Sequence, residues 1–250
     1  MAPPSALPFA KKVIAITGAA RGIGLAIARY LAERGANLAL ADVEREQLEA
    51  SVKDLQRDFP DSQITSTVVN VCSSSEVDSW ITSTVSTFGE LYGAVNNAGI
   101  MGKWGNIDAI EDQDWDRLMN INVGGVMRCL RAELKVLVEG GSIVNTSSVA
   151  GLKASVMLAP YVTSKHAVIG LTKCAALEAA GRRIRVNAVC PGPIETPMLV
   201  EVMKGPALPG PPLARAGKPE EIAAMVGYLL GPESLYTTGA CIPVDGGFAC

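Results

Sequence analysis

Residues 17–24 read Thr-Gly-Ala-Ala-Arg-Gly-Ile-Gly, a glycine-rich stretch from which the organisation of the whole chain can be read. It follows directly on the apolar run Val13–Thr17 and leads into a segment of helical length. Glycine permits a tight turn and a close approach of the backbone to a ligand, and a helix N-terminus offers free N–H groups to a phosphate. The stretch therefore predicts a strand, a turn and a helix that together bind the pyrophosphate of a dinucleotide.

The segment after this turn has the apolar spacing of an amphipathic helix. Ile23, Ala26, Ile27, Tyr30 and Leu31 stand at i, i+3, i+4, i+7 and i+8, so they share one face of a helix. We expect that face to be buried against a sheet.

Seven short apolar runs of strand length alternate with segments of helical length. The runs are Val13–Thr17, Asn37–Asp42, Ile64–Asn70, Leu91–Asn96, Ser142–Ser147, Ile184–Cys190 and Ala240–Val244. Several are continuous rather than alternating in hydrophobicity, which is typical of parallel strands covered on both faces. We therefore expect an α/β protein, a single-domain Rossmann-type doubly wound, seven-stranded parallel sheet with helices on both faces.

The composition favours one domain and a small-molecule partner. The chain has 250 residues, 48% of them hydrophobic, so we expect residues 1–250 to form a single dinucleotide-binding and catalytic domain. Its net charge is −3, and its Lys and Arg residues are scattered, which argues against nucleic acid as a partner.

The termini and the Gly/Pro-rich patch are the segments that we expect outside the packed core. Residues 1–10 lack the features of a signal peptide or membrane anchor and are expected to be a flexible tail. No segment reaches the roughly 18 apolar residues of a membrane span, so a cytoplasmic location is expected. Gly205–Pro212 is too short to separate domains, and we interpret residues 197–212 as a mobile substrate lid.

The cysteines and the histidine indicate no metal. The six cysteines are far apart and never form C-x-x-C, so we expect buried free thiols. His166 is the only histidine and has no Cys or His at ligand spacing, so no conventional zinc site is expected.

Asp42, at the end of the second apolar run, predicts which dinucleotide is used. A carboxylate there accepts hydrogen bonds from both ribose hydroxyls and repels a 2′-phosphate, which favours NAD over NADP. Arg21, inside the glycine turn, is the opposing signal, because its guanidinium could reach a 2′-phosphate or could simply be a solvated loop charge. We expect the repulsion by Asp42 to outweigh it.

Ser148, Tyr161 and Lys165 are the candidates for catalysis. Ser148 follows the fifth apolar run, and Tyr161 and Lys165 are i and i+4 on one helical face. A free tyrosine has a pKa of about 10, and we expect the Lys165 ammonium to lower it. Tyr161 could then take a proton from an alcohol or give one to an alkoxide while Ser148 holds the oxygen. The hydride itself would move to or from the nicotinamide.

From Lys12 to Val244-Asp245-Gly246-Gly247 the sequence resembles the short-chain dehydrogenase/reductase (SDR) family. The glycine turn is similar to its T-G-x-x-x-G-x-G signature, residues 96–99 to its N-N-A-G motif and residues 191–196 to its P-G-x-x-x-T segment. The resemblance implies that Asn122, which would hold a water for a proton relay, completes a catalytic tetrad with Ser148, Tyr161 and Lys165.

The same resemblance implies a set of cofactor-binding residues. Lys165 would also bind the nicotinamide ribose, and the Ile194 backbone and the Thr196 hydroxyl would contact the carboxamide. The whole set is Gly18, Arg21, Gly22, Ile23, Gly24, Asp42, Asn70, Val71, Asn97, Ala98, Gly99, Tyr161, Lys165, Pro191, Gly192, Ile194 and Thr196. Asn70 departs from the family, which usually has an aspartate there, so we expect a weaker contact with adenine or a solvent-facing side chain.

The substrate pocket is expected at the carboxyl ends of the strands. Its predicted lining is mostly apolar, from Met101, Trp104, Val156, Met157, Met198, Leu199, Val202 and Met203. A bulky, largely apolar secondary alcohol or ketone is therefore expected, although these residues could equally serve core packing or subunit contact. Lys103 and Lys153 could bind a substrate carboxylate but are expected to face solvent. The resemblance also implies a homotetramer or homodimer.

Three alternatives to an NAD-linked dehydrogenase remain open on the same fold. They are an NADP-dependent ketoreductase, a cofactor-dependent isomerase or cyclase, and a dinucleotide-sensing protein without turnover. The presence of all four tetrad residues argues against the last of these.

Overall fold

The computed structural model describes residues 7–206 and 210–250. The strands are β1 (Val13–Thr17), β2 (Asn37–Asp42), β3 (Ile64–Val68), β4 (Gly93–Asn96), β5 (Ser142–Thr146), β6 (Arg185–Pro191) and β7 (Cys241–Val244). The α-helices are α1 (Gly22–Ala32), α2 (Arg45–Asp58), α3 (Ser74–Phe88), α4 (Asp112–Met119), α5 (Gly125–Val136), α6 (Ala159–Ala179), α7 (Pro197–Val202) and α8 (Pro219–Leu230). Short helical turns are η1 (Ile107–Ala109), η2 (Asn120–Gly124), η3 (Val149–Gly151), η4 (Ala180–Arg182) and η5 (Pro232–Ser234).

The seven strands form one parallel sheet in the order β3-β2-β1-β4-β5-β6-β7. The chain begins in the middle of the sheet at β1, runs outward to β3, returns to β4 beside β1 and continues to β7. The direction of winding reverses between β1 and β4, and the loops after these two strands therefore part to leave a crevice at their carboxyl ends.

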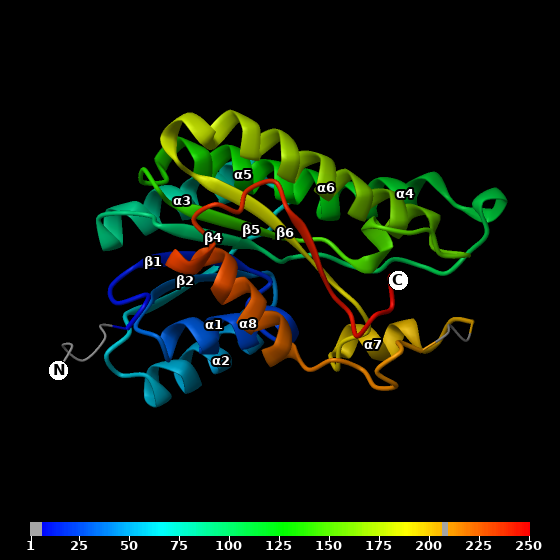
Figure 1. The fold of residues 1–250 in the computed structure, drawn as a ribbon, viewed down its shortest axis with the longest axis horizontal. Coiled ribbons are helices and arrows are strands. Elements are labelled where there is room, and N and C mark those ends of the chain that lie inside the picture. The colour runs from blue at the N-terminus through cyan, green and yellow to red at the C-terminus, as the bar shows by residue number, and fades with distance from the viewer. Residues whose placement is uncertain (1–6, 207–209) are drawn as a thin grey trace.

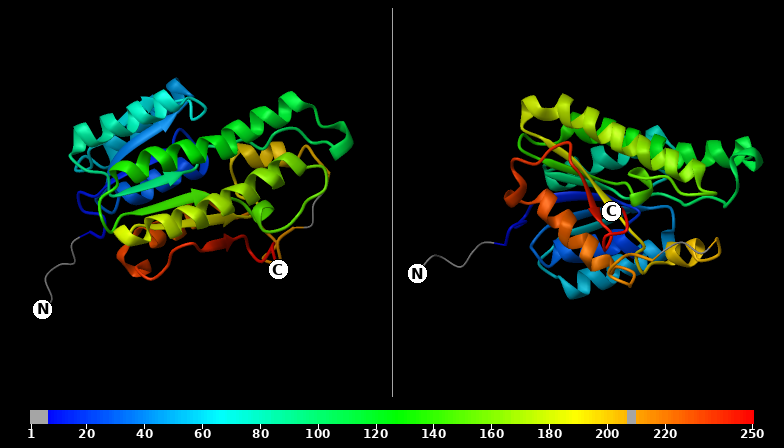
Figure 2. Two further views of the ribbon diagram at one scale, coloured as in Figure 1. Left: turned by 90° about the horizontal axis from the view of Figure 1, so that it is seen from above. Right: turned by 45° about the vertical axis from the view of Figure 1, so that its right-hand side comes forward.

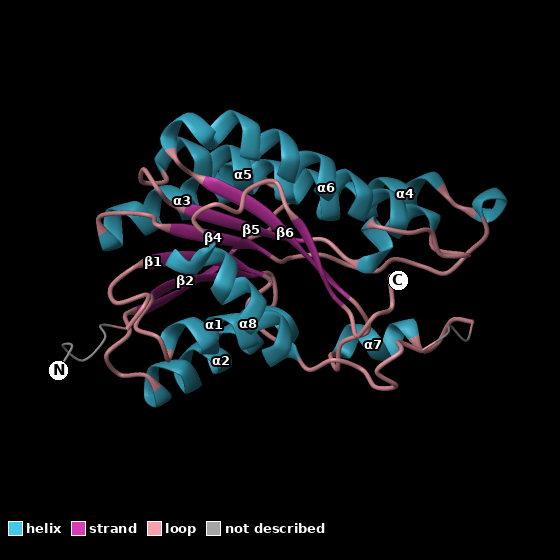
Figure 3. Cartoon of the chain, viewed as in Figure 1, coloured by secondary structure: helices cyan, strands magenta, loops and turns pink. Residues whose placement is uncertain are grey.

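Helices cover both faces of the sheet, as Figures 1 and 3 show. One layer contains α1, α2 and α8, and the other contains α3, α5 and α6, with α4 extending past the carboxyl ends of the strands. The two views in Figure 2 show the same division. Two hydrophobic clusters match the two layers, one with Ile14, Ile27 and Leu31 and the other with Trp80 and Leu130. The predicted seven-stranded, doubly wound fold is confirmed.

All seven predicted strands are present. β1 and β2 have the predicted bounds, and each of the other five differs from its prediction by no more than two residues at either end. Continuous apolar runs locate these strands well because alternate side chains point to opposite faces of the sheet and a helix layer covers each face.

The buried side of α1 is wider than its sequence pattern indicated. Ile27 and Leu31 are buried as expected, whereas Ile23, Ala26 and Tyr30 are only partly buried and pack against the core. Helix α8 lies along a second side of α1, so burial extends beyond the side that faces the sheet. A Cβ on Gly227 of α8 would lie 2.3 Å from the Tyr30 ring, so glycine there lets the two helices approach closely.

Residues 7–10 belong to the fold, which differs from the expectation from sequence. Residues 1–6 lie outside the described residues, but residues 7–10 form a turn and Phe9 is buried in the core. The amide of Phe9 donates to the Arg34 carbonyl at 3.1 Å, which fixes this turn against the end of α1. The expectation of a flexible tail to residue 10 is therefore wrong for residues 7–10. Of the expected lid, residues 207–209 also lie outside the described residues.

The cysteines are free, but only some are buried. Cys129 and Cys190 are buried, Cys72 and Cys241 are partly exposed, and Cys174 and Cys250 are exposed. Cys174 lies on the side of α6 opposite to its buried residues, so the prediction of buried thiols is wrong for this position. No group of three potential metal-ligand side chains is present within residues 7–206 and 210–250. None of the helices in this part of the chain has the length and hydrophobicity needed to cross a membrane.

Candidate active site

A cavity of about 950 Å³ opens at the carboxyl ends of the strands, where the winding reverses. It is lined by residues that follow β1, β2, β4, β5 and β6, together with parts of α6, α7 and the C-terminal residues. Nearly every site residue predicted from the sequence lines this cavity. The two exceptions are Gly24 and Asn122, which lie behind its wall.

The glycine turn forms one end of the cavity. Gly18 and Gly22 have φ of +65° and +57°, which residues with a side chain rarely adopt. A Cβ on Gly18 would lie 3.0 Å from the Ala98 amide nitrogen, and one on Gly24 would lie 2.0 Å from the Gly18 carbonyl oxygen. Gly24 thus allows α1 to start directly against the turn, so its contribution to cofactor binding is indirect.

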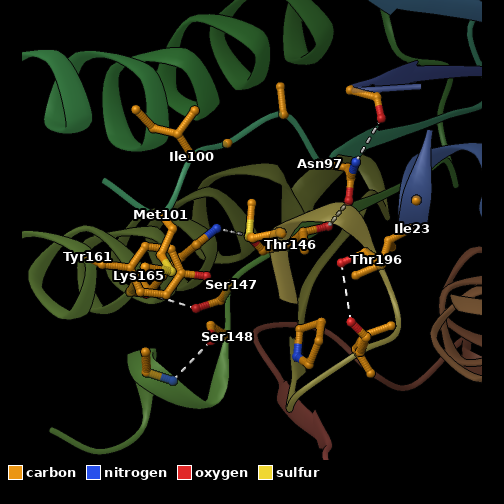
Figure 4. A pocket seen from close by; sticks show the side chains of 18 of the residues that line it. Ile23, Asn97, Ile100, Met101, Thr146, Ser147, Ser148, Tyr161, Lys165 and Thr196 are labelled. Carbon is orange, nitrogen blue, oxygen red and sulfur yellow. Dashed lines mark hydrogen bonds between the residues drawn. The ribbon is translucent and has the colours of Figure 1, made fainter. Parts of the chain in front are cut away.

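The glycine turn is tied to the N-N-A-G motif by one threonine. The Thr17 hydroxyl accepts hydrogen bonds from the amides of Asn97 and Ala98 at 3.1 and 3.2 Å. The Asn97 side chain donates to the Gly18 carbonyl at 3.1 Å and accepts from the Thr146 hydroxyl at 3.3 Å. These bonds connect the ends of β1, β4 and β5, as Figure 4 shows in part. The glycine turn and the hydrogen-bonded N-N-A-G motif together form a cradle. Its glycines leave space for a ligand and its hydrogen bonds hold it rigid, which suits a dinucleotide.

Asp42 lines the cavity next to this cradle and is held by the backbone. One carboxylate oxygen accepts from the Ala20 amide at 3.0 Å, and the other accepts from the Glu44 amide at 3.1 Å. Both bonds fix the position of the Asp42 carboxylate. The neighbouring Arg21 guanidinium forms an ion pair with the Glu44 carboxylate, a contact that the sequence patterns did not reveal.

Asn70 and Val71 line the cavity on the far side of Asp42. The Asn70 side-chain oxygen accepts from the Cys72 amide at 3.0 Å, and its own amide donates to Glu76 at 2.8 Å. The oxygen that was expected to meet the adenine amino group therefore already serves a local turn, with one lone pair left.

Ser148, Tyr161 and Lys165 come together on the cavity wall, as predicted (Figure 4). Ser148 begins η3, and its hydroxyl accepts from the Ala150 amide at 3.1 Å. The Ser147 hydroxyl donates to the Lys165 carbonyl at 2.9 Å, which fixes η3 against α6. Lys165 donates to the Thr146 carbonyl at 2.9 Å, and its Nζ lies 5.6 Å from the centre of the Tyr161 ring.

The pKa of Tyr161 shifts in the opposite direction to the one expected. Burial raises the pKa of the Tyr161 hydroxyl, and hydrogen bonding with Ser148 offsets this only in part. Burial also lowers the pKa of Lys165 to about 8, because the ammonium loses hydration, while the nearby Cys190 acts weakly in the other direction. Lys165 is directed at the Thr146 carbonyl rather than at the phenol, so its charge does not outweigh burial in setting the direction of the Tyr161 shift.

Asn122 lies behind the loop that follows β4 and is held there by its side chain. It lies in η2, a π-helical turn, and its side-chain oxygen accepts from the Ile100 amide at 2.8 Å. Its side-chain nitrogen donates to the Ile100 carbonyl at 2.8 Å and to Ser164 at 3.1 Å, and Ser164 in turn donates to the Tyr161 carbonyl. Both amide hydrogens are therefore used, and this side chain connects α6 to the loop after β4.

The segment after β6 closes the cavity beside the glycine turn. Pro191, Gly192, Ile194 and Thr196 all line it, and the Thr196 hydroxyl donates to the Ile194 carbonyl at 3.2 Å. The Gly22 backbone lies against Thr196, since a Cβ on Gly22 would be 3.3 Å from the Thr196 methyl group.

The substrate end of the cavity is only partly as predicted. Met101, Val156, Met198, Leu199 and Val202 line it, whereas Trp104, Met157 and Met203 do not.

Trp104 instead covers Gly205 beyond α7, where a Cβ would lie 2.1 Å from the indole, and donates to the Glu201 carbonyl at 3.4 Å. Lys103 pairs with Asp114 outside the cavity. Lys153 lines the cavity, and so does Phe248, which the sequence patterns did not indicate.

A buried network of polar side chains connects β4 and β5 with helices α5 and α6. Asn96 donates to Glu133 of α5 and to Asn145 of β5, both at 3.0 Å, and Asn145 donates to Thr172 of α6 at 3.0 Å. Burial raises the pKa of Glu133 to about 7, and one oxygen each of Glu133 and Asn96 has no partner within the described residues. The network joins the two strands that carry the N-N-A-G motif and Ser148.

The fold and the site are those of a dinucleotide-binding α/β protein in which a serine, a tyrosine and a lysine line the cavity. A family model described as enoyl-(acyl carrier protein) reductase matches residues 18–249. The short-chain dehydrogenase/reductase aba4 of Botryotinia fuckeliana is 43% identical over 98% of this chain and 100% of its own length.

Levodione reductase of Leifsonia aquatica is 37% identical over 96% and 94% of the two chains. A crystal structure of levodione reductase superimposes with a TM-score of 0.93 over 96% and 98%. Cyclohexanol dehydrogenase of Acinetobacter sp. (strain SE19) is 35% identical over 96% of each chain. The chain belongs to the short-chain dehydrogenase/reductase family. It is an oxidoreductase of alcohols or ketones, in a family that uses NAD or NADP.

Proposed function

We propose that the protein transfers a hydride between NAD(H) and a secondary alcohol or ketone that is bulky and largely apolar, with Tyr161 as the proton-transferring residue. One observation carries the proposal. Ser148, Tyr161 and Lys165 line the same cavity as the glycine turn and Asp42, so a substrate and a dinucleotide can meet there.

The bound cofactor would supply or accept the hydride at its nicotinamide. Ser148 would donate its hydroxyl to the carbonyl oxygen of a ketone and hold it next to Tyr161. Because the raised pKa keeps the phenol protonated, Tyr161 would give its proton to that oxygen as the alcohol forms. In the reverse direction the alcohol's proton would return to Tyr161.

Lys165 would bind the nicotinamide ribose and orient the phenol, a role that its burial and its bond to Thr146 support. Its lowered pKa makes it a readily exchanging proton carrier near neutral pH. Asn122 would contribute by fixing α6 against the loop after β4.

The preference for NAD rests on two carboxylates next to the cradle. The Asp42 carboxylate is held in place by two backbone amides, so a 2′-phosphate would meet a negative charge at a fixed position. Glu44 pairs with Arg21, the cation that could otherwise bind that phosphate. Both contacts support NAD as the physiological cofactor.

The nature of the lining supports the proposed substrate class. Met101, Met198, Leu199 and Val202 give that end of the cavity an apolar wall. Two of the similar proteins are named for levodione and cyclohexanol, and cyclohexanol is a ring alcohol. Ring ketones and ring alcohols are therefore the first substrates to test.

A homodimer or homotetramer is part of the proposal. Met127 and Val136 of α5 and Leu177 of α6 are exposed apolar side chains on adjacent helices. Light scattering on the purified protein is expected to give two or four times the chain mass of 26.1 kDa. A mass of one chain at micromolar concentration would contradict this part of the proposal.

The test of the function is a spectrophotometric assay of NADH oxidation with cyclohexanone, and of NAD reduction with cyclohexanol. Wild-type protein is expected to turn over both, and more efficiently with NAD(H) than with NADP(H). Better turnover with NADPH would reject the cofactor assignment. Binding of NADH without turnover of any ring or open-chain ketone would instead favour a sensing protein.

A further inference from the structure

Strand β7 is followed by a compact turn over residues 245–250, here called the C-terminal turn. The two carboxylate oxygens of Asp245 accept from the amides of Gly247 and Ala249 at 2.9 and 2.7 Å. Gly246 and Gly247 have φ of +62° and +86°, which only glycine adopts without strain. The carboxylate and the two glycines together fix the direction in which Phe248 leaves the turn.

The C-terminal turn is fastened to two parts of the site. A Cβ on Gly192, next to the end of β6, would lie 2.8 Å from the Cα of Asp245, and the Gly192 amide donates to the Val244 carbonyl at 3.1 Å. The Leu213 amide, beyond the lid, donates to the Gly246 carbonyl at 3.1 Å. The turn is therefore fixed relative to the segment expected to bind the nicotinamide.

Phe248 extends from this turn to the wall of the cavity that Ser148 and Tyr161 also line. Lys153, five residues after Ser148, contacts both the backbone and the ring of Phe248. The Lys153 ammonium donates to the Phe248 carbonyl and lies 4.0 Å from the centre of the Phe248 ring. Such a cation over an aromatic face is attracted by the ring's quadrupole, so Lys153 restrains the ring as well as the backbone.

We propose that Phe248 contacts the substrate and selects for a ring next to the reacting carbon, and that Lys153 is the residue that positions Phe248. The inference rests on the proposed function and identifies Phe248 as the residue that distinguishes substrates by shape. A flat aromatic surface makes its largest contact with another ring, whereas a short open chain covers little of it. Met198 and Val202 of α7 line the same end and add apolar surface without a flat face.

The test compares two ketones in the wild-type protein and in Phe248→Ala, using NADH. Cyclohexanone is the ring substrate and 2-butanone is the open-chain one. The ratio of their kcat/KM values is expected to fall about tenfold in Phe248→Ala, through a higher KM for cyclohexanone. The kcat for cyclohexanone and the KM for NADH are expected to stay within about twofold, because Phe248 takes no part in proton transfer.

Two variants separate a shape-reading ring from a general loss of structure. Phe248→Leu keeps apolar volume without a flat face and is expected to give an intermediate ratio. Tyr236→Ala removes an aromatic ring that is fully exposed and outside the cavity, and it is expected to leave the ratio unchanged. An unchanged ratio in Phe248→Ala, with the wild-type melting temperature, would overturn the proposal.

Lys153→Met keeps most of the side-chain length and removes the charge. If Lys153 acts through Phe248, the variant is expected to lower the ratio about threefold and to have no further effect when combined with Phe248→Ala. Fully multiplicative effects of the two changes would show that Lys153 acts independently of the ring and would reject its positioning role.

A binding measurement keeps the inference testable if no ketone is reduced. Calorimetric titration of cyclohexanone into the NADH-loaded protein is expected to give a Kd about tenfold lower for wild type than for Phe248→Ala. Absence of turnover alone would reject the proposed reaction and leave this contact standing. Equal Kd values would reject the contact whether or not a hydride is transferred.

Discussion

The nucleotide end and the substrate end of the cavity are built in different ways. At the nucleotide end, backbone groups of β1, β2 and β4 are locked to one another through Thr17, Asn97 and Asp42. At the substrate end, the walls come from α7, from the loop after Ser148 and from the C-terminal turn, and they meet through a few side-chain contacts such as Lys153 with Phe248. A ligand shared by all relatives needs the first kind of construction, and one that differs between relatives is accommodated by the second.

Tyr161 lies between these two ends, and its loss is expected to have the largest effect. Tyr161→Phe removes the hydroxyl and retains the ring, so kcat/KM for cyclohexanone should fall at least about a thousandfold, while the Kd for NADH stays within about twofold. Steady-state kinetics and fluorescence titration measure the two quantities. Tyr236→Phe serves as the control. Retention of more than about a tenth of the wild-type activity would refute the assignment of Tyr161.

The buried polar network that contains Glu133 should make the stability of the protein depend on pH. The pKa of Glu133 is about 7 in the folded protein and 4.5 in an unfolded chain, so the unfolded state loses its proton first as pH rises. This group therefore destabilises the fold progressively between these two values and by a constant amount above them. Glu133→Gln cannot lose a proton, and its side-chain NH2 group replaces the unpartnered oxygen and can donate to the unpartnered oxygen of Asn96.

The prediction for Glu133→Gln is a stability gain that grows with pH. Relative to wild type, its free energy of unfolding should rise by about 2 kcal/mol between about pH 5 and pH 8, as measured by urea denaturation. Glu139→Gln changes an exposed carboxylate that pairs with Arg183 and is the matched control. The same difference at both pH values would mean that Glu133 does not titrate in this range.

Asp42→Ala should show that the two ends of the cavity act independently, because it alters the preference for cofactor without altering the preference for ketone. The ratio of kcat/KM for NADH to that for NADPH is expected to fall about thirtyfold as the repulsion of the 2′-phosphate is lost. The cyclohexanone to 2-butanone ratio should not change. Asp61→Ala, an exposed change outside the cavity, is the control. A wild-type cofactor ratio in Asp42→Ala would contradict the role given to this carboxylate.

Glu44→Gln should have the smallest effect, and it tests whether the ion pair with Glu44 keeps Arg21 away from a 2′-phosphate. An exposed ion pair contributes less than about 1 kcal/mol, so freeing Arg21 should improve kcat/KM for NADPH by only about threefold. Glu49→Gln breaks a comparable pair with Arg45 on α2, away from the cavity, and should change nothing. If both variants gave the same gain, the cause would be net charge and not the release of Arg21.

The placement of the residues around the glycine turn could be predicted from the sequence, because a glycine turn, a strand-end acid and an N-N-A-G motif each depend on local backbone geometry. The meeting of Ser148 with Tyr161 and Lys165 followed from the order of the elements. Three features did not: the Asn122 bonds to Ile100, the pairing of Arg21 with Glu44, and the position of Phe248. Each depends on residues far apart in the sequence or on side-chain directions that no periodicity encodes.

The pKa of Tyr161 shows the same limit in electrostatic terms. A spacing of four residues brings Lys165 to the correct helical face, but it does not reveal that the ammonium is used by the Thr146 carbonyl. Nor does the spacing reveal that the phenol lies half-buried in the cavity wall. The sign of the shift is set by these two facts.

The contact between Trp104 and Gly205 gives the protein an optical reporter of its own. Because the indole lies directly over a residue without a side chain, any movement of the segment after α7 changes the polarity around Trp104 and hence its emission. The chain has only three tryptophans, and Trp80 is buried in the core. With Trp80 and Trp115 replaced by phenylalanine, the fluorescence of this single residue would report any change in the contact when a cofactor or ketone is added, without any label.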